Sequence, residues 1–399
     1  TLIGGLAGDA ITTGGQNVSL GYNALGANTT GASNVAVGHN ASKKTTTASN
    51  NTVVGKDALE ENTTGAGNTA VGKDALQTNT TASNNTAIGL EALHLNTTGA
   101  LNVAVGSISL DANTTGSENV AIGLNALGAS DTGSRNVAVG RAALGAHNPD
   151  GAQDGYNVAM GYDALTTSTT AARNTAVGGL AMRVSTTGAE NVAIGYSAMV
   201  ANTTGNRNAA LGDTALDANT TGSDNTALGN GALGANTTAS NNTAVGAGAL
   251  LDNTTGAQNT AVGRSALANL TTAVSNVAVG QAAGVNCTTG TENVFVGNNV
   301  AAALTTASQC IIIGDNAAAG SAITGSNLVV IGDNSGYNLT GGVANTTIVG
   351  PQAGGNMTSA ANCLILGNNA GITGSPGGNI TTADNNICLG DENIQNAHI

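Results

Sequence analysis

Residues 68–84 read NTAVGKDALQTNTTASN, and variants of this 17-residue unit fill almost the whole chain. The glycine at the fifth position of the unit recurs at Gly21, Gly38, Gly55, Gly72, Gly89, Gly106, Gly123 and Gly140. Each step is therefore 17 residues (38 − 21, 72 − 55), and after one longer step to Gly161 the same spacing continues as far as Gly314. A short fixed period indicates a repeat architecture, in which each unit packs against the units before and after it.

The start of each unit has the pattern of a short strand. Counting the asparagine as position 1, position 2 is mostly β-branched, as in Thr69, position 4 is aliphatic, as in Val71, and position 3 is almost always alanine. Side chains alternate along a strand, so positions 2 and 4 share one face while positions 3 and 5 share the other. We expect position 4 to form a buried aliphatic ladder, and the alanine–glycine face to allow close approach of a neighbouring chain.

The rest of the unit is expected to turn the chain back to its starting side. A second short strand is predicted at positions 8 and 9, as in Ala75–Leu76, with the leucine joining the core. The polar stretches GKD and NTTG are typical of turns, because glycine and asparagine tolerate left-handed backbone and threonine can bond to nearby backbone. A helix is disfavoured, since a glycine recurs inside every unit.

These features predict an all-β fold, a parallel β-solenoid (β-roll) of 17-residue coils. A unit of 17 residues is too short to bury an apolar face alone, so the coils must stack, with equivalent positions roughly 4.8 Å apart. The asparagines at positions 1 and 12 are then expected to form ladders of side-chain amides between successive coils.

The composition disfavours two classes of partner, nucleic acids and membranes. The net charge of −13 disfavours binding to nucleic acid, which requires clustered lysine and arginine, and no apolar run is long enough to predict membrane insertion. The opening Thr1-Leu2-Ile3-Gly4 matches positions 2 to 5 of the unit, so we expect the chain to be a piece of a longer polypeptide.

No pattern in the sequence predicts an enzyme, a metal site or a cofactor. The four cysteines, Cys287, Cys310, Cys363 and Cys388, lack zinc-ligand spacing and are interpreted as small buried hydrophobic residues. The four histidines, His39, His94, His147 and His398, lie in different coils and are interpreted as solvated turn residues. We therefore assign no catalytic, cofactor-binding or metal-binding residue, and no receptor-binding residue is identified.

Two departures from the period divide the chain. The step from Gly140 to Gly161 carries four extra residues, which predicts a loop near residues 147–154. Residues 1–297 are expected to form a regular solenoid shaft, and residues 298–399 an irregular distal solenoid with longer loops. In the distal part the alanine at position 3 gives way to larger residues such as Phe295 and Ile312, which predicts a different packing of that face.

The tandem motif resembles the repeats of bacteriophage tail fibres, as in NTAVGRSALANLTT (residues 259–272) and NTALGNGALGANTT (residues 225–238). It is more distantly similar to the head domains of trimeric autotransporter adhesins. The ending NNICLGDENIQNAHI resembles the segment that precedes a self-cleaving chaperone in many such fibres. The resemblance implies a homotrimeric structural fibre, located on a virion tail fibre or otherwise extracellular, that serves attachment to a host-cell glycan or protein.

Two alternatives stay open at this stage. A bacterial surface adhesin of the trimeric autotransporter type would have a related repeat, and stacked threonines could form an ice-binding array. Within the fibre interpretation, the regular coils are expected to act as a spacer. Contact with a cell surface is expected in the irregular end or beyond Ile399, with residues 147–154 as a candidate inside the shaft.

Overall fold

The computed structural model describes residues 1–148, 154–372 and 378–391. Most of the predicted loop insertion, and His398, lie outside these residues. The chain divides into two compact units, Thr1–Thr204 and Gly205–Ile399. The expected change at residue 297 falls inside the second of these units.

Each coil contributes one short strand. In the first unit the strands are β1 (Leu2–Ile3), β2 (Val18–Leu20), β3 (Val35–Val37), β4 (Thr52–Val54), β5 (Thr69–Val71), β6 (Thr86–Ile88), β7 (Val103–Val105), β8 (Val120–Ile122), β9 (Val137–Val139), β10 (Val158–Met160), β11 (Thr175–Val177) and β12 (Val192–Ile194). In the second they are β13 (Ala209–Leu211), β14 (Thr226–Leu228), β15 (Thr243–Val245), β16 (Thr260–Val262), β17 (Val277–Val279), β18 (Val294–Val296), β19 (Ile311–Ile313), β20 (Val329–Ile331), β21 (Thr347–Val349), β22 (Leu364–Leu366) and β23 (Ile387–Leu389).

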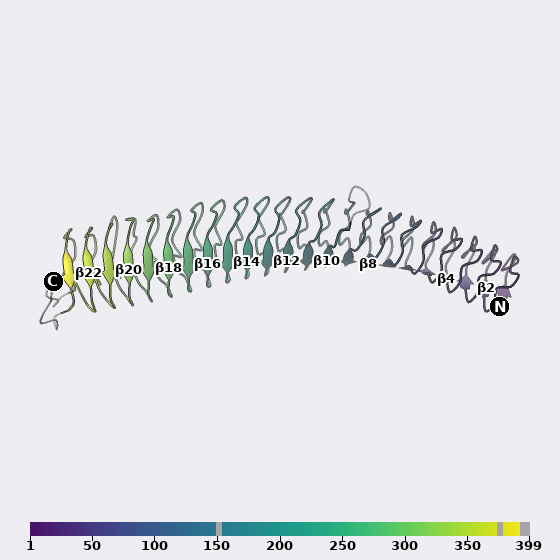
Figure 1. Ribbon diagram of the computed structural model, residues 1–399, viewed down its shortest axis with the longest axis horizontal. Helices are drawn as coiled ribbons and strands as arrows, with labels where there is room; N and C mark the ends of the chain where they lie inside the picture. The colour runs from purple at the N-terminus through teal and green to yellow at the C-terminus, as the bar shows by residue number, and fades with distance from the viewer. Residues whose placement is uncertain (149–153, 373–377, 392–399) are drawn as a thin grey trace. The chain divides into compact units, whose positions relative to one another are not determined.

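Within each unit, successive strands lie side by side and run parallel (Figure 1). Equivalent positions pair, as where Ala70 of β5 faces Ala87 of β6. The register carries over the longer step before Gly161 as well, because Ala138 of β9 faces Ala159 of β10. The predicted parallel β-solenoid of 17-residue coils is therefore confirmed.

The predicted second strand at positions 8 and 9 is wrong. Ala75–Leu76 lies in a continuous turn, and the backbone φ angles of Asp74, Leu76 and Asn84 are 59°, 52° and 60°. Left-handed backbone at positions 7, 9 and 17 bends the chain sharply three times in each coil. A leucine with positive φ is uncommon, so the coil holds position 9 in this conformation by packing rather than by local preference.

The predicted burial of position 4 is also wrong. Alanine at position 3 is fully buried, together with positions 8 and 9, as in Ala70, Ala75 and Leu76. Positions 2 and 4 point outward instead, and Ile88 is 40% exposed. The interior of one coil is narrow, and the leucine at position 9 and the asparagine at position 12 already fill much of it. In most coils the inner side of the strand carries only the methyl group of alanine, although Val53 is also fully buried at this position.

The glycine at position 5 is required by close backbone contact. Gly72 has a φ of 138°, and a Cβ atom there would lie 2.2 Å from the carbonyl oxygen of Gly89 in the next coil. A φ in this range is almost restricted to glycine. The recurring glycine therefore marks a place where the backbones of adjacent coils approach closely.

The predicted amide ladders are confirmed, and the two ladders differ in their bonding. At position 1, the backbone N–H of Asn68 donates to Oδ1 of Asn51 at 2.8 Å, and Nδ2 of Asn68 donates to the carbonyl of Ala82 at 2.9 Å. At position 12, Nδ2 of Asn79 donates to Oδ1 of Asn62 at 3.0 Å and to the carbonyl of Ala82, also at 3.0 Å. Both asparagines are fully buried in their coils, so these bonds satisfy polar groups that have no access to water.

The core changes its composition within the second unit. Phe295 fills position 3 with a large ring, and the preceding coil has Gly284 at position 9, where most coils have leucine. A Cβ atom at Gly284 would lie 2.5 Å from Cδ2 of Phe295. The larger residue at position 3 is thus accommodated inside the solenoid by a smaller one at position 9 of the preceding coil, which is the different packing that the sequence predicts.

Candidate functional site

The outer side of the strands carries an extended apolar surface. We call this side, formed by positions 2 and 4 of every strand, the strand face. Many of its members are more than a third exposed, including Leu20 (43%), Ile88 (40%), Ile122 (39%), Leu211 (50%), Leu228 (38%) and Ile311 (42%). Of the two faces of the strands, the strand face is therefore the one that other molecules can contact. The alanine–glycine face, which the sequence predicted for this role, points into the coil.

Register makes the strand face continuous within each unit. Val71 faces Ile88, Ile88 faces Val105 and Val105 faces Ile122, so position 4 forms an unbroken aliphatic row along the coils. Parallel sheets are normally covered on both faces. In this chain the coil itself covers the inner face of the sheet, while the outer face is bare.

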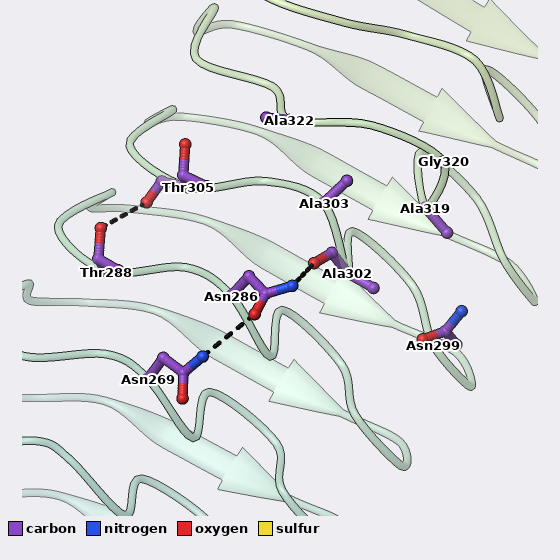
Figure 2. Close-up of a pocket in the computed structure, with 10 residues that line it drawn as sticks. All are labelled: Asn269, Asn286, Thr288, Asn299, Ala302, Ala303, Thr305, Ala319, Gly320 and Ala322. Carbon is purple, nitrogen blue, oxygen red and sulfur yellow. Dashed lines mark hydrogen bonds between the residues drawn. The ribbon is translucent and has the colours of Figure 1, made fainter.

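A first groove lies on the turn side of the second unit and has a volume of about 530 Å³. Figure 2 shows its lining, which consists of Asn269, Asn286, Thr288, Asn299, Ala302, Ala303, Thr305, Ala319, Gly320 and Ala322. Asn269 donates through Nδ2 to Oδ1 of Asn286 at 3.1 Å, and Asn286 donates through Nδ2 to the carbonyl of Ala302 at 2.7 Å. The floor is therefore a chain of amides that continues from one coil to the next.

A second groove of about 280 Å³ lies further along the same unit. It is lined by Asn334, Tyr337, Asn338, Gln352, Gly355, Asn356 and Ile372. The Tyr337 side chain is 43% exposed, and Nδ2 of Asn338 donates to the carbonyl of Gly355 at 2.6 Å. None of the described residues that line either groove is charged.

The first groove lies where positions 10 and 11 of two successive coils are small, with Ala302 and Ala303 in one coil and Ala319 and Gly320 in the next. The second groove has Tyr337 and Asn338 at these positions. The irregular period predicts longer loops in this part of the chain, but it does not predict a depression in the surface.

The residues beside the predicted loop insertion form a polar surface cluster. Arg135 pairs with Asp154 and with Glu118, whose carboxylate is 2.9 Å from Nε of Arg135. The Arg135 guanidinium lies 5.8 Å from the ring centre of Tyr156, and its hydrogen bonds and carboxylate neighbours raise the pKa of Arg135. These groups bond mainly to one another, so the cluster joins adjacent coils at the base of the insertion.

The histidines are placed differently from one another. The His39 ring stacks on Tyr22 with ring centres 5.5 Å apart, and its side chain is 51% exposed, as predicted for a turn. Nδ1 of His94 is 3.2 Å from the carbonyl of Asp74. His147 contradicts the prediction, because it is 1% exposed and burial lowers its pKa to about 4.

All four cysteines are buried and form no disulfide among the described residues, and their burial is as predicted. Burial raises the pKa of Cys287 to about 12 and also raises the pKa of Cys310. A thiol is nucleophilic only as the thiolate, so burial disfavours reaction at Cys287. These residues pack the core of the second unit.

Within residues 1–148, 154–372 and 378–391, no three histidine, cysteine or acidic side chains are close enough together to hold a metal ion. Over the same residues, no helix has the length and apolar character needed to cross a membrane. In comparisons with known proteins, no family model matches the chain, and no curated protein matches it significantly.

Proposed function

We propose that the chain is a structural fibre protein, in which copies of the chain pack together through the strand face to form a homotrimeric shaft that serves attachment to a host cell. The observation that carries this proposal is the continuous exposed aliphatic row at position 4. A soluble protein rarely leaves a long apolar stripe uncovered, and such a stripe usually marks an interface.

The partner that best fits the strand face is another copy of the same chain. The apolar rows repeat once per coil, so a partner that matches them along their length needs the same 17-residue period. Closed symmetric assemblies of identical chains are the common way to satisfy this requirement. The number three comes from the resemblance to trimeric fibres.

The interface can be tested with two neighbouring residues of β8. Ile122 lies on the strand face and is 39% exposed, whereas Ala121 is fully buried in the coil. We expect Ile122→Glu to dissociate the assembly in light scattering while the β-sheet signal in circular dichroism is kept. Ala121→Glu should instead unfold the coils around it, because it buries an unpaired charge. A monomer for the unmodified chain at micromolar concentration would contradict the proposal.

For attachment, we propose that the two grooves of the second unit contact a neutral glycan. Their lining offers amide and hydroxyl groups that both donate and accept hydrogen bonds, and Tyr337 offers an exposed aromatic ring. Specific recognition usually needs a concave site with a few anchoring aromatic residues. The absence of charge among the described lining residues disfavours acidic sugars.

This part of the proposal is tested on an array of neutral oligosaccharides. Tyr337→Ala should lower binding at least tenfold, whereas Tyr196→Ala, which removes a tyrosine that is 59% exposed in the first unit, should leave binding unchanged. Equal binding by both variants would place the contact elsewhere. That result would leave the proposed assembly through the strand face intact.

A further inference from the structure

The amide ladder at position 12 is interrupted within the first unit by five consecutive side chains with unbonded polar atoms. The atoms are Oδ1 of Asn113, Oγ of Ser130, both ring nitrogens of His147, Oγ of Ser168 and Oγ of Ser185. His147 is 1% exposed and the other four residues are fully buried. A buried polar atom without a partner is costly, and five such groups in successive coils are not explained by chance variation.

The backbone at these positions does not differ from that of the regular coils. The N–H of Asn113 donates to the carbonyl of Leu110 at 3.3 Å, and the corresponding bonds of Ser130 and His147 both measure 3.2 Å. The side chains therefore start from equivalent places inside the coil. What changes is the side chain: serine is shorter than asparagine, and none of the three serine hydroxyls has a hydrogen-bond partner in the protein.

Another coil shows how the protein satisfies a hydroxyl at this position when it uses only its own atoms. Thr45 also occupies position 12, and its Oγ1 lies 2.6 Å from Oγ of Ser42 at position 9. The coils of Ser130, Ser168 and Ser185 have Leu127, Leu165 and Met182 at position 9, and these side chains offer no hydrogen bond.

We propose that position 12 of these five coils is an internal hydration site, in which a row of ordered water molecules replaces the missing amides between Asn113 and Ser185. Buried water typically makes about three hydrogen bonds to polar groups that are otherwise unsatisfied. Each serine hydroxyl and the neutral imidazole both donate and accept, and the amide oxygen of Asn113 accepts. A small ligand that also donates and accepts fits every member of the row.

Charged ligands fit the row less well. A cation would need carboxylate or several convergent oxygen ligands, and no acidic side chain belongs to the row. An anion would need a positive charge, and His147 is neutral near pH 7 because burial lowers its pKa to about 4. Water is the small neutral ligand that remains.

The direction in which one substitution changes the Tm distinguishes a hydrated row from a dry one. In a hydrated row, Ser168→Ala removes a partner of bound water and should lower the Tm by about 2–4 °C. In a dry row, the same substitution removes an orphaned hydroxyl and should leave the Tm unchanged or raise it. Ser42→Ala, which removes a hydroxyl with a protein partner, calibrates the loss of a known bond.

A variant in which asparagine again occupies position 12 of these coils gives a second measurement, which is independent of the Tm change of Ser168→Ala. The variant Ser130→Asn/His147→Asn/Ser168→Asn/Ser185→Asn should have a higher Tm than the unmodified chain, because asparagine at position 12 bonds to its neighbours in regular coils. A high-resolution crystal structure of the unmodified chain should show ordered water along the row, and the variant should lack it. A water-free row in the unmodified chain, or an unchanged or higher Tm for Ser168→Ala, would overturn the proposal.

Discussion

At the scale of single residues, backbone geometry explains why some positions of the 17-residue repeat vary so little from coil to coil. The glycine at position 5 combines a φ of 138° at Gly72 with a contact that leaves no room for a Cβ atom. The leucine at position 9, such as Leu76, adopts a φ of 52° and is completely buried. Each coil thus stores some backbone strain, which the packing of neighbouring coils must offset.

Replacing a glycine at position 5 should therefore be strongly destabilising. We expect Gly72→Ala to lower the free energy of unfolding by at least about 1–3 kcal/mol from backbone conformation alone, with the contact to Gly89 adding to the loss. Gly15→Ala is the control, because a Cβ atom there has no neighbour within 4 Å. Chemical denaturation of both variants measures the difference. Equal stability would mean that the close contact between coils can relax.

His147 should make the stability of the chain depend on pH. Its pKa falls from the ordinary 6.5 to about 4 in the folded chain, because burial disfavours the charged ring. Between these values the unfolded chain binds a proton that the folded chain does not. The contribution of the neutral His147 ring to the free energy of unfolding is therefore fully present above pH 6.5, and it is lost as the pH falls toward 4.

The loss attributable to His147 should reach about 3 kcal/mol at 1.36 kcal/mol per pKa unit. His147→Asn removes the titrating group, so the stability difference between this variant and the unmodified chain should change over that pH range and level off below it. Thermal denaturation from pH 7 to pH 4 tests this. A constant difference between the two proteins would show that His147 is not buried as a neutral ring.

At the scale of the element, the interior of the solenoid has a limited volume, which the residues at positions 3 and 9 share in different proportions. Most coils pair alanine at position 3 with leucine at position 9, as in Ala70 and Leu76, which are both fully buried. The second unit also uses the reverse combination, with Gly284 beside the ring of Phe295. Volume inside the solenoid is conserved although the residues are not, as expected for close-packed interiors.

Because Phe295 occupies the space of a position 9 side chain, restoring leucine at Gly284 should destabilise the chain. Gly284→Leu restores the common residue of position 9, but its Cβ atom would meet Phe295 at 2.5 Å, so overpacking should cost about 1–3 kcal/mol. Phe295→Ala alone should cost about 3–5 kcal/mol by leaving a cavity. The double variant should be more stable than the sum of both losses predicts. Additive losses in denaturant unfolding would contradict the proposed exchange of volume.

At the scale of the whole molecule, each coil contacts mainly the coils beside it. Within the second unit, position 3 pairs with position 3 of the next coil, as where Ala210 faces Ala227. Stability of such a stack is close to a sum over coils and their contacts. Whole coils should therefore be removable, whereas fractions of a coil should not.

A deletion of two coils tests this prediction. Removing Asn208–Asn241 takes out 34 residues (2 × 17) and joins Arg207 to Asn242, which again has asparagine at position 1. This variant should fold, keep its oligomeric state and, under the proposed function, still bind cells. Removing residues 208–232 instead places Leu233 where an asparagine belongs, and should disrupt the neighbouring coils. Similar melting curves for both deletions would refute dependence on register.

Local pattern alone was enough to predict the repeat, the strand at positions 2 to 4, the parallel stacking and the amide ladders. Each of these follows from residues within one period, such as Asn68, Ala70 and Gly72, and from the requirement that identical coils stack. The burial of the thiols was predicted on a different ground, because the spacing of the four cysteines fits no zinc site.

Only the tertiary structure decided which side of the strand faces inward. Alternation assigns Val71 and Ala70 to opposite faces, but it is symmetric and does not say which face is the interior. That choice depends on the opposite wall of the coil, where Leu76 and Asn79 fill the space and leave room for one methyl group. The grooves and the buried ring of His147 likewise depend on what lies across the coil, because available volume is a property of the closed turn and not of any one segment.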